Sequence, residues 1–267
     1  MHKEFDKLLY RARENDLVVI ILTNGTRITD RHMEVLQDIQ PEEVQVSLYS
    51  MSPEEHDEIT QVKGSHKRTI DGILRLIEAD INVTLSCPVM KVNKDSYKNV
   101  LQWANVRGLP LKTDFMLYGC TDQSNSNINN RLNKDDMTTI IEDTLHDDKS
   151  YRNRIANNEV PINPDELKDK PLCGAGLDSL SMDTEGNYHF CTVFRSKDLG
   201  NVHNNSLNDV WNNSQAILDL RRVKWGDFPG CLKCEAFNYC GMCFARNANE
   251  NSGDHTTINT NCCEVSF

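Results

Sequence analysis

Cysteine is the residue type of this chain best suited to chemistry, and its ten copies are unevenly distributed. Cys87 and Cys120 stand alone, whereas the other eight lie in the last part of the sequence: Cys173, Cys191, Cys231, Cys234, Cys240, Cys243, Cys262 and Cys263. The sequence shows no apolar signal segment, and its longest apolar run, Leu17–Leu22, is far too short to cross a bilayer. We therefore expect a cytoplasmic protein with no membrane partner, in which disulfides are rare and clustered cysteines bind metal or act in catalysis.

The closest cysteine pairs, Cys231-x2-Cys234 and Cys240-x2-Cys243, have the spacing at which a turning backbone aims two thiolates at one metal centre. A structural zinc site would use these pairs, but few residues separate them for a zinc ribbon, and the remaining cysteines would have no role. Some thiols could instead be buried without a ligand, as we expect for Cys87 in its strand. Iron–sulfur clusters would employ seven or eight of the cysteines and are the interpretation that we favour.

Length and charge narrow the class of protein. A chain of 267 residues can form one large domain or two modest ones. Its net charge of −11 argues against a nucleic-acid partner, because phosphate binding needs a basic stripe.

The first region alternates strands with amphipathic helices. Short apolar runs predict four strands at Leu17–Thr23, Val44–Leu48, Val83–Val89 and Leu111–Leu117. Apolar stripes predict helices around Phe5–Ala12, Ile70–Ile77 and Tyr97–Ala104. This alternation implies right-handed βαβ units and an α/β fold with a parallel sheet, whose chemistry lies at the carboxyl ends of the strands. The residues at or just beyond such ends are Thr23, Asn24, Gly25, Ser47 and Asn93.

The Leu17–Leu22 run is fully apolar, which is typical of a parallel strand covered on both faces. No strand precedes it in the sequence to flank it. We therefore expect either that a later strand covers it or that the domain is missing its start.

A charged, proline-containing stretch separates the two regions. We predict one domain over 1–148, a linker over 149–170 and a second domain over 171–267, with a helix from about Asp136 to Leu145 before the linker. Within the second domain, the turn signal Asp183–Gly186 predicts a hairpin that returns Cys191 towards Cys173.

The cysteine pattern of the second domain resembles a SPASM domain. The matching elements are Cys173-x12-Gly186-x4-Cys191, Cys231-x2-Cys234-x5-Cys240, Cys243 and a terminal cysteine, with similar segments at Leu199–Val202, Ser206–Trp211 and Pro229–Cys231. SPASM domains follow radical S-adenosylmethionine (radical SAM) barrels, and the first region is similar to the later part of such a barrel at Thr23–Gly25, Val46–Tyr49, His56–Asp57 and Gly64–Ile70. The resemblance implies a partial (β/α) radical SAM barrel followed by a small cysteine-rich SPASM domain.

The same resemblance implies two auxiliary 4Fe–4S clusters. The first would be held by Cys173, Cys191 and Cys243, and the second by Cys231, Cys234, Cys240 and Cys262. The fourth ligand of the first cluster stays open, with Cys263 and Cys120 as candidates. Adjacent side chains of an extended chain diverge, so we do not expect Cys262 and Cys263 to serve one cluster, and we assign Cys262 to the second.

The family also implies that S-adenosylmethionine binds near the strand ends that carry Thr23, Asn24, Gly25, Ser47 and Asn93. The alternatives stay open: Asn24-Gly25 has the composition of an ordinary turn, and Ser47 could be an ordinary strand-end serine. No catalytic residue is identified.

Three features depart from the family. The sequence contains no Cys-x3-Cys-x2-Cys loop, which holds the cluster that cleaves S-adenosylmethionine, and no Gly-Gly-Glu segment after the second family strand; Gly241-Met242 also provides two residues where the family usually has three. We expect an N-terminally truncated or split form, inactive alone, in which S-adenosylmethionine and a third cluster bind only to the full-length enzyme. A separate chain is a candidate source of the missing barrel start.

The resemblance implies an iron–sulfur oxidoreductase that removes hydrogen from a peptide or protein substrate through a radical derived from S-adenosylmethionine. The auxiliary clusters would accept the electron left after bond formation or position the substrate. Because the initiating motif is absent, whether this chain is itself an enzyme stays open. Two alternatives are a non-catalytic, metal-stabilised peptide-binding module and a simple zinc-stabilised domain.

Overall fold

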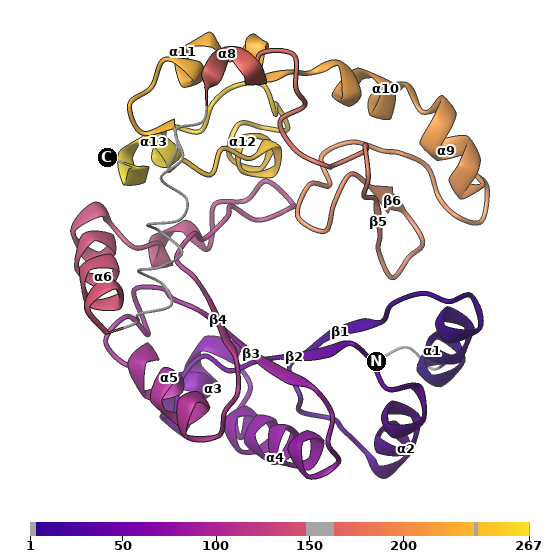
Figure 1. Ribbon diagram of the computed structural model, residues 1–267, viewed down its shortest axis with the longest axis vertical. Helices are drawn as coiled ribbons and strands as arrows, with labels where there is room; N and C mark the ends of the chain where they lie inside the picture. The colour runs from indigo at the N-terminus through magenta and orange to yellow at the C-terminus, as the bar shows by residue number, and fades with distance from the viewer. Residues whose placement is uncertain (1–3, 148–162, 238–239, 267) are drawn as a thin grey trace. The chain divides into compact units, whose positions relative to one another are not determined.

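The computed structural model describes residues 4–147, 163–237 and 240–266, and the chain divides into two compact units, Met1–Leu117 and Tyr118–Phe267. The first unit contains a four-stranded sheet in the order β1-β2-β3-β4. Its elements are α1 (Phe5–Glu14), β1 (Ile20–Thr23), α2 (Asp30–Ile39), β2 (Glu43–Ser47), α3 (Pro53–Thr60), α4 (Ser65–Glu78), β3 (Val83–Pro88), α5 (Tyr97–Val106) and β4 (Leu111–Asp114). The predicted α/β fold with a parallel sheet is confirmed, and each predicted strand and helix of this unit is present (Figure 1).

The sheet is parallel throughout, and its register separates two faces. Val46 pairs with Thr23 and with Leu85, so these residues share the face covered by helices. Val46 and Leu85 are fully buried there, together with Ile73 of α4. The opposite face carries polar side chains on the central strands, including Gln45 and its partner Thr84. The Lys112 ammonium group reaches Gln45 Oε1 at 3.1 Å on that face.

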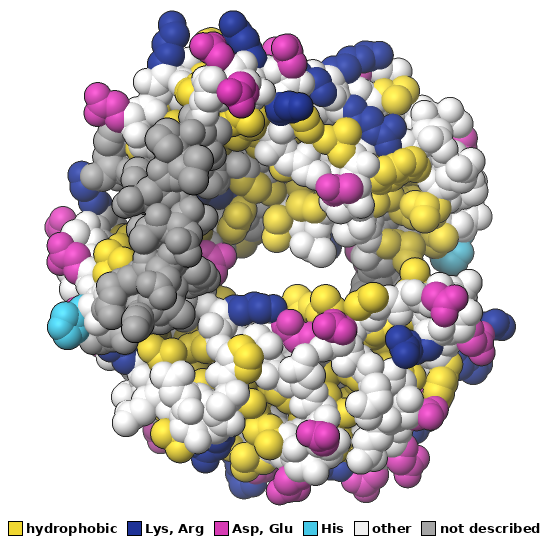
Figure 2. Space-filling view, viewed as in Figure 1, with side chains coloured by type: hydrophobic (Ala, Val, Ile, Leu, Met, Phe, Trp, Pro, Cys, Tyr) yellow, Lys and Arg dark blue, Asp and Glu magenta, His cyan; other side chains and the backbone are white. Residues whose placement is uncertain are grey.

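Strand β1 lies at an edge of the sheet. Within the described part of the chain, no later strand pairs with its outer side, so the first of the two expected arrangements is not observed. Ile20 is 53% exposed and Leu22 is 70% exposed, and Figure 2 shows hydrophobic side chains at the surface over β1. An apolar, unpaired parallel strand is unusual and favours pairing with another strand.

Two glycines let α4 approach the turn after β1. Gly25 has φ +70°, a conformation that glycine adopts without strain, and Gly72 lies opposite it in the middle of α4. A Cβ atom at Gly72 would lie 2.2 Å from the Gly25 carbonyl oxygen. The Thr69 hydroxyl donates to the Asn24 carbonyl oxygen at 2.8 Å and stabilises the contact between α4 and this turn.

Apart from the 14-residue helix α6, the second unit is built from short elements. Its elements are η1 (Ile128–Asn130), α6 (Lys134–Asp147), α8 (Pro164–Leu167), β5 (Ser181–Met182), β6 (Tyr188–His189), α9 (Leu207–Asn213), α10 (Gln215–Arg222), η2 (Trp225–Asp227), α11 (Pro229–Leu232), α12 (Phe244–Glu250) and α13 (Thr260–Ser266). Its core is aromatic, with Phe190 and Phe194 at 4.7 Å between ring centroids and Phe244 packed next to them.

The predicted hairpin and the helix before the linker are confirmed. Strands β5 and β6 pair antiparallel, and Gly186 takes φ +84° in the turn between them. Helix α6 covers the predicted Asp136–Leu145 helix. The predicted linker falls outside the described residues over 149–162, and its remainder includes the short helix α8. None of the described helices is long and apolar enough to span a membrane.

Candidate metal centres

The first group of thiols is assembled by the β5–β6 hairpin and the start of α12. The hairpin returns the chain so that Cys191 lies close to Cys173, and Cys243 stands at the N-terminal cap of α12. Burial raises the pKa of the Cys173 thiol, and the neighbouring Cys243 and Cys191 raise it further. The three predicted ligands of the first cluster thus come together from segments far apart in the sequence.

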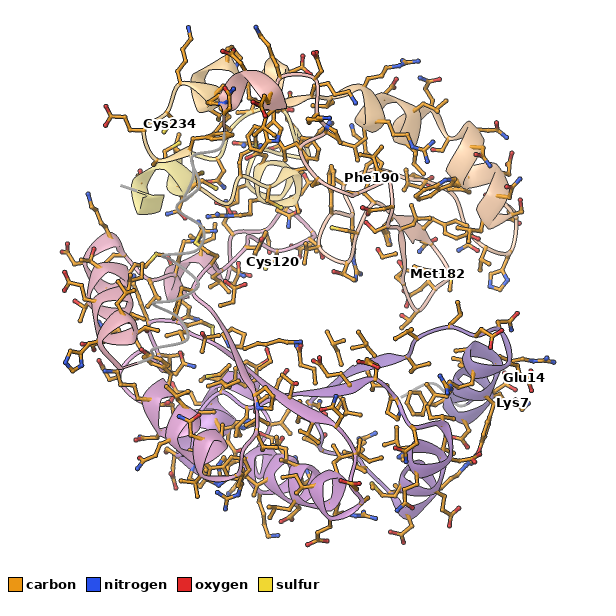
Figure 3. The ribbon with its side chains drawn as sticks, in the orientation of Figure 1. Lys7, Glu14, Cys120, Met182, Phe190 and Cys234 are labelled. Carbon is orange, nitrogen blue, oxygen red and sulfur yellow. The ribbon has the colours of Figure 1, made fainter. Side chains whose placement is uncertain are left out.

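The second group of thiols surrounds a cavity of about 140 Å³. Its cysteine lining residues are Cys231, Cys234, Cys240, Cys262 and Cys263, and the rest of the lining is mostly apolar, including Trp225, Phe237 and Ile258. Figure 3 labels Cys234 among the elements of this region. A water-poor pocket lined by thiols is a suitable environment for an iron–sulfur cluster, whose ligands are deprotonated cysteines.

Local turns explain how Cys231 and Cys234 reach the same cavity. Pro229 stands at the start of the short helix α11, and the Cys231 amide donates to the Phe228 carbonyl at 3.0 Å. The Cys234 amide then donates to the Cys231 carbonyl at 3.0 Å. This turn brings both side chains to the wall of one cavity.

Helix α13 carries the last two cysteines, so the premise that they lie on an extended chain is wrong. Successive side chains of a helix point about 100° apart and can line the same cavity, as Cys262 and Cys263 do. Cys262 is buried with 1% exposure, whereas Cys263 is exposed. The choice of Cys262 as the fourth ligand of the second cluster stays a prediction.

Burial favours the protonated form of three of these thiols. Burial raises the pKa of Cys262 to about 11, and burial also raises the pKa values of Cys231 and Cys263. Because metal binding deprotonates thiols, binding of metal at this site would release the thiol protons. In the described part of the chain, no three Cys, His, Asp or Glu side chains converge closely enough to hold a single ion. Clustered thiols are the ligand type that iron–sulfur clusters use, and this role of the group stays a prediction.

The remaining two cysteines lie elsewhere. Cys87 is fully buried in β3, and burial raises the pKa of its thiol to about 12, as expected for an unligated core thiol. The Cys120 sulfur is 3.7 Å from the Ser126 hydroxyl in a loop of the second unit, where Figure 3 labels it. Of the two candidates for the fourth ligand of the first cluster, Cys263 is placed with the second group.

At the carboxyl ends of β1 and β2, three of the five predicted cofactor-binding residues line one cavity of about 920 Å³: Thr23, Asn24 and Ser47. Gly25 forms the turn beneath α4. Asn93 is fully buried, and its side-chain amide donates to the carbonyl oxygens of Tyr49 at 2.9 Å and Pro88 at 3.1 Å. Asn93 therefore ties the ends of two strands together, and its cofactor role stays a prediction.

A carboxylate that the sequence-based site did not include organises the same edge. Asp57 accepts the His66 amide and the Ser65 hydroxyl, both at 2.9 Å, and also the Gly64 amide. These bonds, led by that of the His66 amide, lower the pKa of Asp57 to about 2. Asp57 thus caps the N-terminus of α4, where a negative charge also stabilises the helix dipole.

His56 is buried beside Asp57 with 1% exposure. Its Nδ1 lies 3.1 Å from the Ser65 hydroxyl, while its Nε2 has no partner among the described residues. Burial, followed by the nearby His66, lowers the pKa of His56 to about 4. The only sequence signal for this arrangement was the adjacent pair His56–Asp57, because the burial of His56 depends on tertiary contacts.

Comparisons with known proteins agree with this architecture. The family model of the radical SAM superfamily matches residues 1–104, and that of the iron–sulfur cluster-binding SPASM domain matches residues 173–235. Residues 1–104 thus match a radical SAM domain and residues 173–235 a SPASM domain.

Two curated relatives and one solved structure illustrate the similarity. The subtilosin biosynthesis protein AlbA of Bacillus subtilis is 27% identical over 94% of this chain and 56% of its own length. The AdoMet-dependent heme synthase of Nitratidesulfovibrio vulgaris is 24% identical over 96% of this chain and 74% of its own length. The structure of anSMEcpe with bound AdoMet and Cp18Cys peptide has a TM-score of 0.67 at 16% identity, covering 99% of this chain and 77% of that chain.

Proposed function

We propose that this chain forms the auxiliary-cluster domain and part of the cofactor-facing barrel of a radical SAM/SPASM oxidoreductase that modifies a peptide or protein. The observation that carries the proposal is the assembly of two separate thiol groups from distant segments. One unites Cys173, Cys191 and Cys243, and the other surrounds a shared apolar cavity. A relative named as a peptide cyclase and a solved structure with a bound peptide support the substrate class.

The two groups would each hold a 4Fe–4S cluster. Cys173, Cys191 and Cys243 would ligate the first, and four thiols of the second group would ligate the other, with Cys262 as the terminal ligand. When bound, such clusters accept and release single electrons. The chain's own residues position the thiolates and exclude water with aromatic side chains.

The cavity at the ends of β1 and β2 would receive S-adenosylmethionine. Thr23, Asn24 and Ser47 present hydroxyl and amide groups there, which suit the polar parts of that cofactor. The chain contains no triad of closely spaced cysteines for the cluster that cleaves the cofactor. We therefore expect that it does not cleave S-adenosylmethionine by itself.

We expect the sheet of the barrel to be completed at the unpaired edge of β1. Leu22, 70% exposed, and Ile20, 53% exposed, would be covered when a further parallel strand pairs there. That strand would come from a separate chain or from another segment of the same polypeptide, together with the missing cysteine motif.

Metal analysis tests the cluster proposal. Anaerobic reconstitution should give a brown protein with roughly eight irons per chain, as expected for two 4Fe–4S clusters. Cys191→Ser and Cys234→Ser should each reduce the iron content to about four, because each disables one group. Cys87→Ser is the matched control and should keep all the iron, since Cys87 lies apart in a strand. Stoichiometric zinc without iron would contradict the proposal.

A second assay tests whether the chain cleaves S-adenosylmethionine by itself. The reconstituted chain should produce no 5′-deoxyadenosine from S-adenosylmethionine and dithionite above a no-protein control. Turnover by the chain alone would show that an unrecognised site replaces the missing motif.

A further inference from the structure

Arg246 is a buried charge in the middle of α12. It lies three residues after Cys243 and is only 1% exposed, and its neighbours on the helix are buried as well. A guanidinium group stays protonated at any ordinary pH. A fully buried arginine is rare unless an anion compensates its charge.

The described residues do not supply that anion. The Arg246 Nη2 is 3.4 Å from the Asn261 side-chain oxygen, and its guanidinium carbon lies 5.6 Å from the centroid of the Tyr118 ring. Both partners are neutral. The Nε and Nη1 atoms are buried and have no partner within the described part of the chain.

The buried carboxylate on the same helix is already engaged. Glu250 accepts Arg131 Nη1 at 3.0 Å and the Gly119 amide at 3.2 Å, and the Arg131 and Glu250 side chains are 9% and 11% exposed. This pair neutralises itself. Among the described residues of the second unit, Arg246 is therefore a buried positive charge without a compensating anion.

The second thiol group can supply this compensation, because Arg246 contacts the helix that carries Cys262. Asn261, which contacts Arg246, is the residue before Cys262 on α13. A 4Fe–4S cluster with four thiolate ligands is anionic, because the thiolates outweigh the positive charge of its core.

We propose that Arg246 is the counter-charge of the second cluster, a positioning residue whose buried guanidinium raises the cluster's reduction potential and orients Cys262. One-electron reduction adds a negative charge to the cluster, so a nearby fixed positive charge stabilises the reduced form. This inference rests on the proposed function, since it requires that the Cys262 group holds a cluster.

The test is a redox titration of the reconstituted chain in a Cys191→Ser background, which leaves the second cluster as the only spectroscopic signal. Arg246→Met removes the charge and keeps the bulk of the side chain, and it should lower the midpoint potential. The ratio of reduced to oxidised cluster at a given potential should fall about tenfold, which corresponds to 59 mV for one electron. Arg246→Lys keeps the charge and should retain most of the wild-type potential.

Arg222→Met serves as the matched control, because the Arg222 side chain is 73% exposed on α10 and should leave the potential unchanged. An unchanged potential in Arg246→Met at full iron content would overturn the inference. If Arg246→Met loses the cluster, the iron content of Arg246→Lys tests the inference. Recovery of iron in Arg246→Lys would support a need for the positive charge, and no recovery would overturn the inference. Absence of iron from the Cys191→Ser parent would instead contradict the proposed function.

Discussion

The Met1–Leu117 unit has a core of regular elements, in which strands β2 and β3 bury Val46 and Leu85 completely against Ile73 of α4. The Tyr118–Phe267 unit has two-residue strands, short helices and a core of phenylalanines, and it leaves a thiol-lined cavity inside. Backbone ladders and apolar burial can stabilise the first unit on their own, given a partner for β1. The second unit has fewer such ladders, so we infer that metal–thiolate bonds supply the missing stability.

Metal removal should produce the largest difference in protease resistance between the two units. Anaerobic chelation of iron should make residues 164–266 about tenfold more susceptible to a protease, because thiolate sites and the fold around them form together. Residues 20–114 should keep their resistance. Mass spectrometry of the fragments would locate the cleavage sites.

Cys234→Ala should act in the same direction as chelation. Equal sensitivity of both units would show that the first unit also depends on iron. Unchanged proteolysis and unchanged iron content in Cys234→Ala would show that Cys234 is not a ligand.

Addition of a methyl group at Gly72 should destabilise the first unit without affecting the iron sites. Gly72→Ala would place its Cβ 2.2 Å from the Gly25 carbonyl oxygen, and relief of this clash should cost about 1–3 kcal/mol despite the better helix propensity of alanine. Denaturant titration followed through Trp103, the tryptophan of this unit, would measure it.

Gly230→Ala is the control in the second unit, since a Cβ there meets no atom within 4 Å. It should leave iron content and the unfolding of the first unit unchanged. A Gly72→Ala variant as stable as the wild type would mean that α4 can move away from the turn.

Acid should weaken the first unit in two windows. The pKa of His56 is lowered to about 4, so the unfolded state binds more protons, and stability should fall as the pH drops from about 6.5 to about 4. The pKa of Asp57 is lowered to about 2, so its contribution is present above the unfolded value and is lost between about pH 4 and pH 2.

Two variants assign these windows. His56→Gln should flatten the pH dependence of unfolding in the upper window, and Asp57→Asn should flatten it in the lower one. Identical pH profiles for both variants and the wild type would show that neither group titrates during unfolding.

The smallest effect is expected for the charge pair on the open face of the sheet. Lys112 Nζ lies 2.6 Å from Glu43 Oε1, but the lysine side chain is 56% exposed, so Lys112→Met should change stability by at most about 1 kcal/mol. Thermal unfolding at low and high salt would reveal this contribution. A loss well above that size would indicate that the pair is shielded from solvent.

Periodicity and spacing were sufficient to predict the four strands of the first unit, its helices α1, α4 and α5, and the β5–β6 hairpin, whereas α2 and α3 were not predicted. The predicted Leu17–Thr23 strand is real but begins at Ile20, because only those residues find a partner in β2. The grouping of the cysteines could be predicted because thiols are rare and their spacing is restrictive, and their role as ligands stays a prediction. Arg246, His56 and Asp57 could not be assigned roles in this way, since arginine, histidine and aspartate are usually exposed and only tertiary contacts bury or bridge them.

The Asp57 cap has a consequence for hydrogen exchange. Because the carboxylate binds the amides of Gly64 and His66, these two protons exchange with solvent only when the start of α4 opens. Neither amide touches a thiol group, so their exchange rates report the local opening of this helix end in the presence and absence of iron alike. A pair of slowly exchanging amides would thus provide an internal reference for the integrity of the first unit while the second is loaded, stripped or mutated.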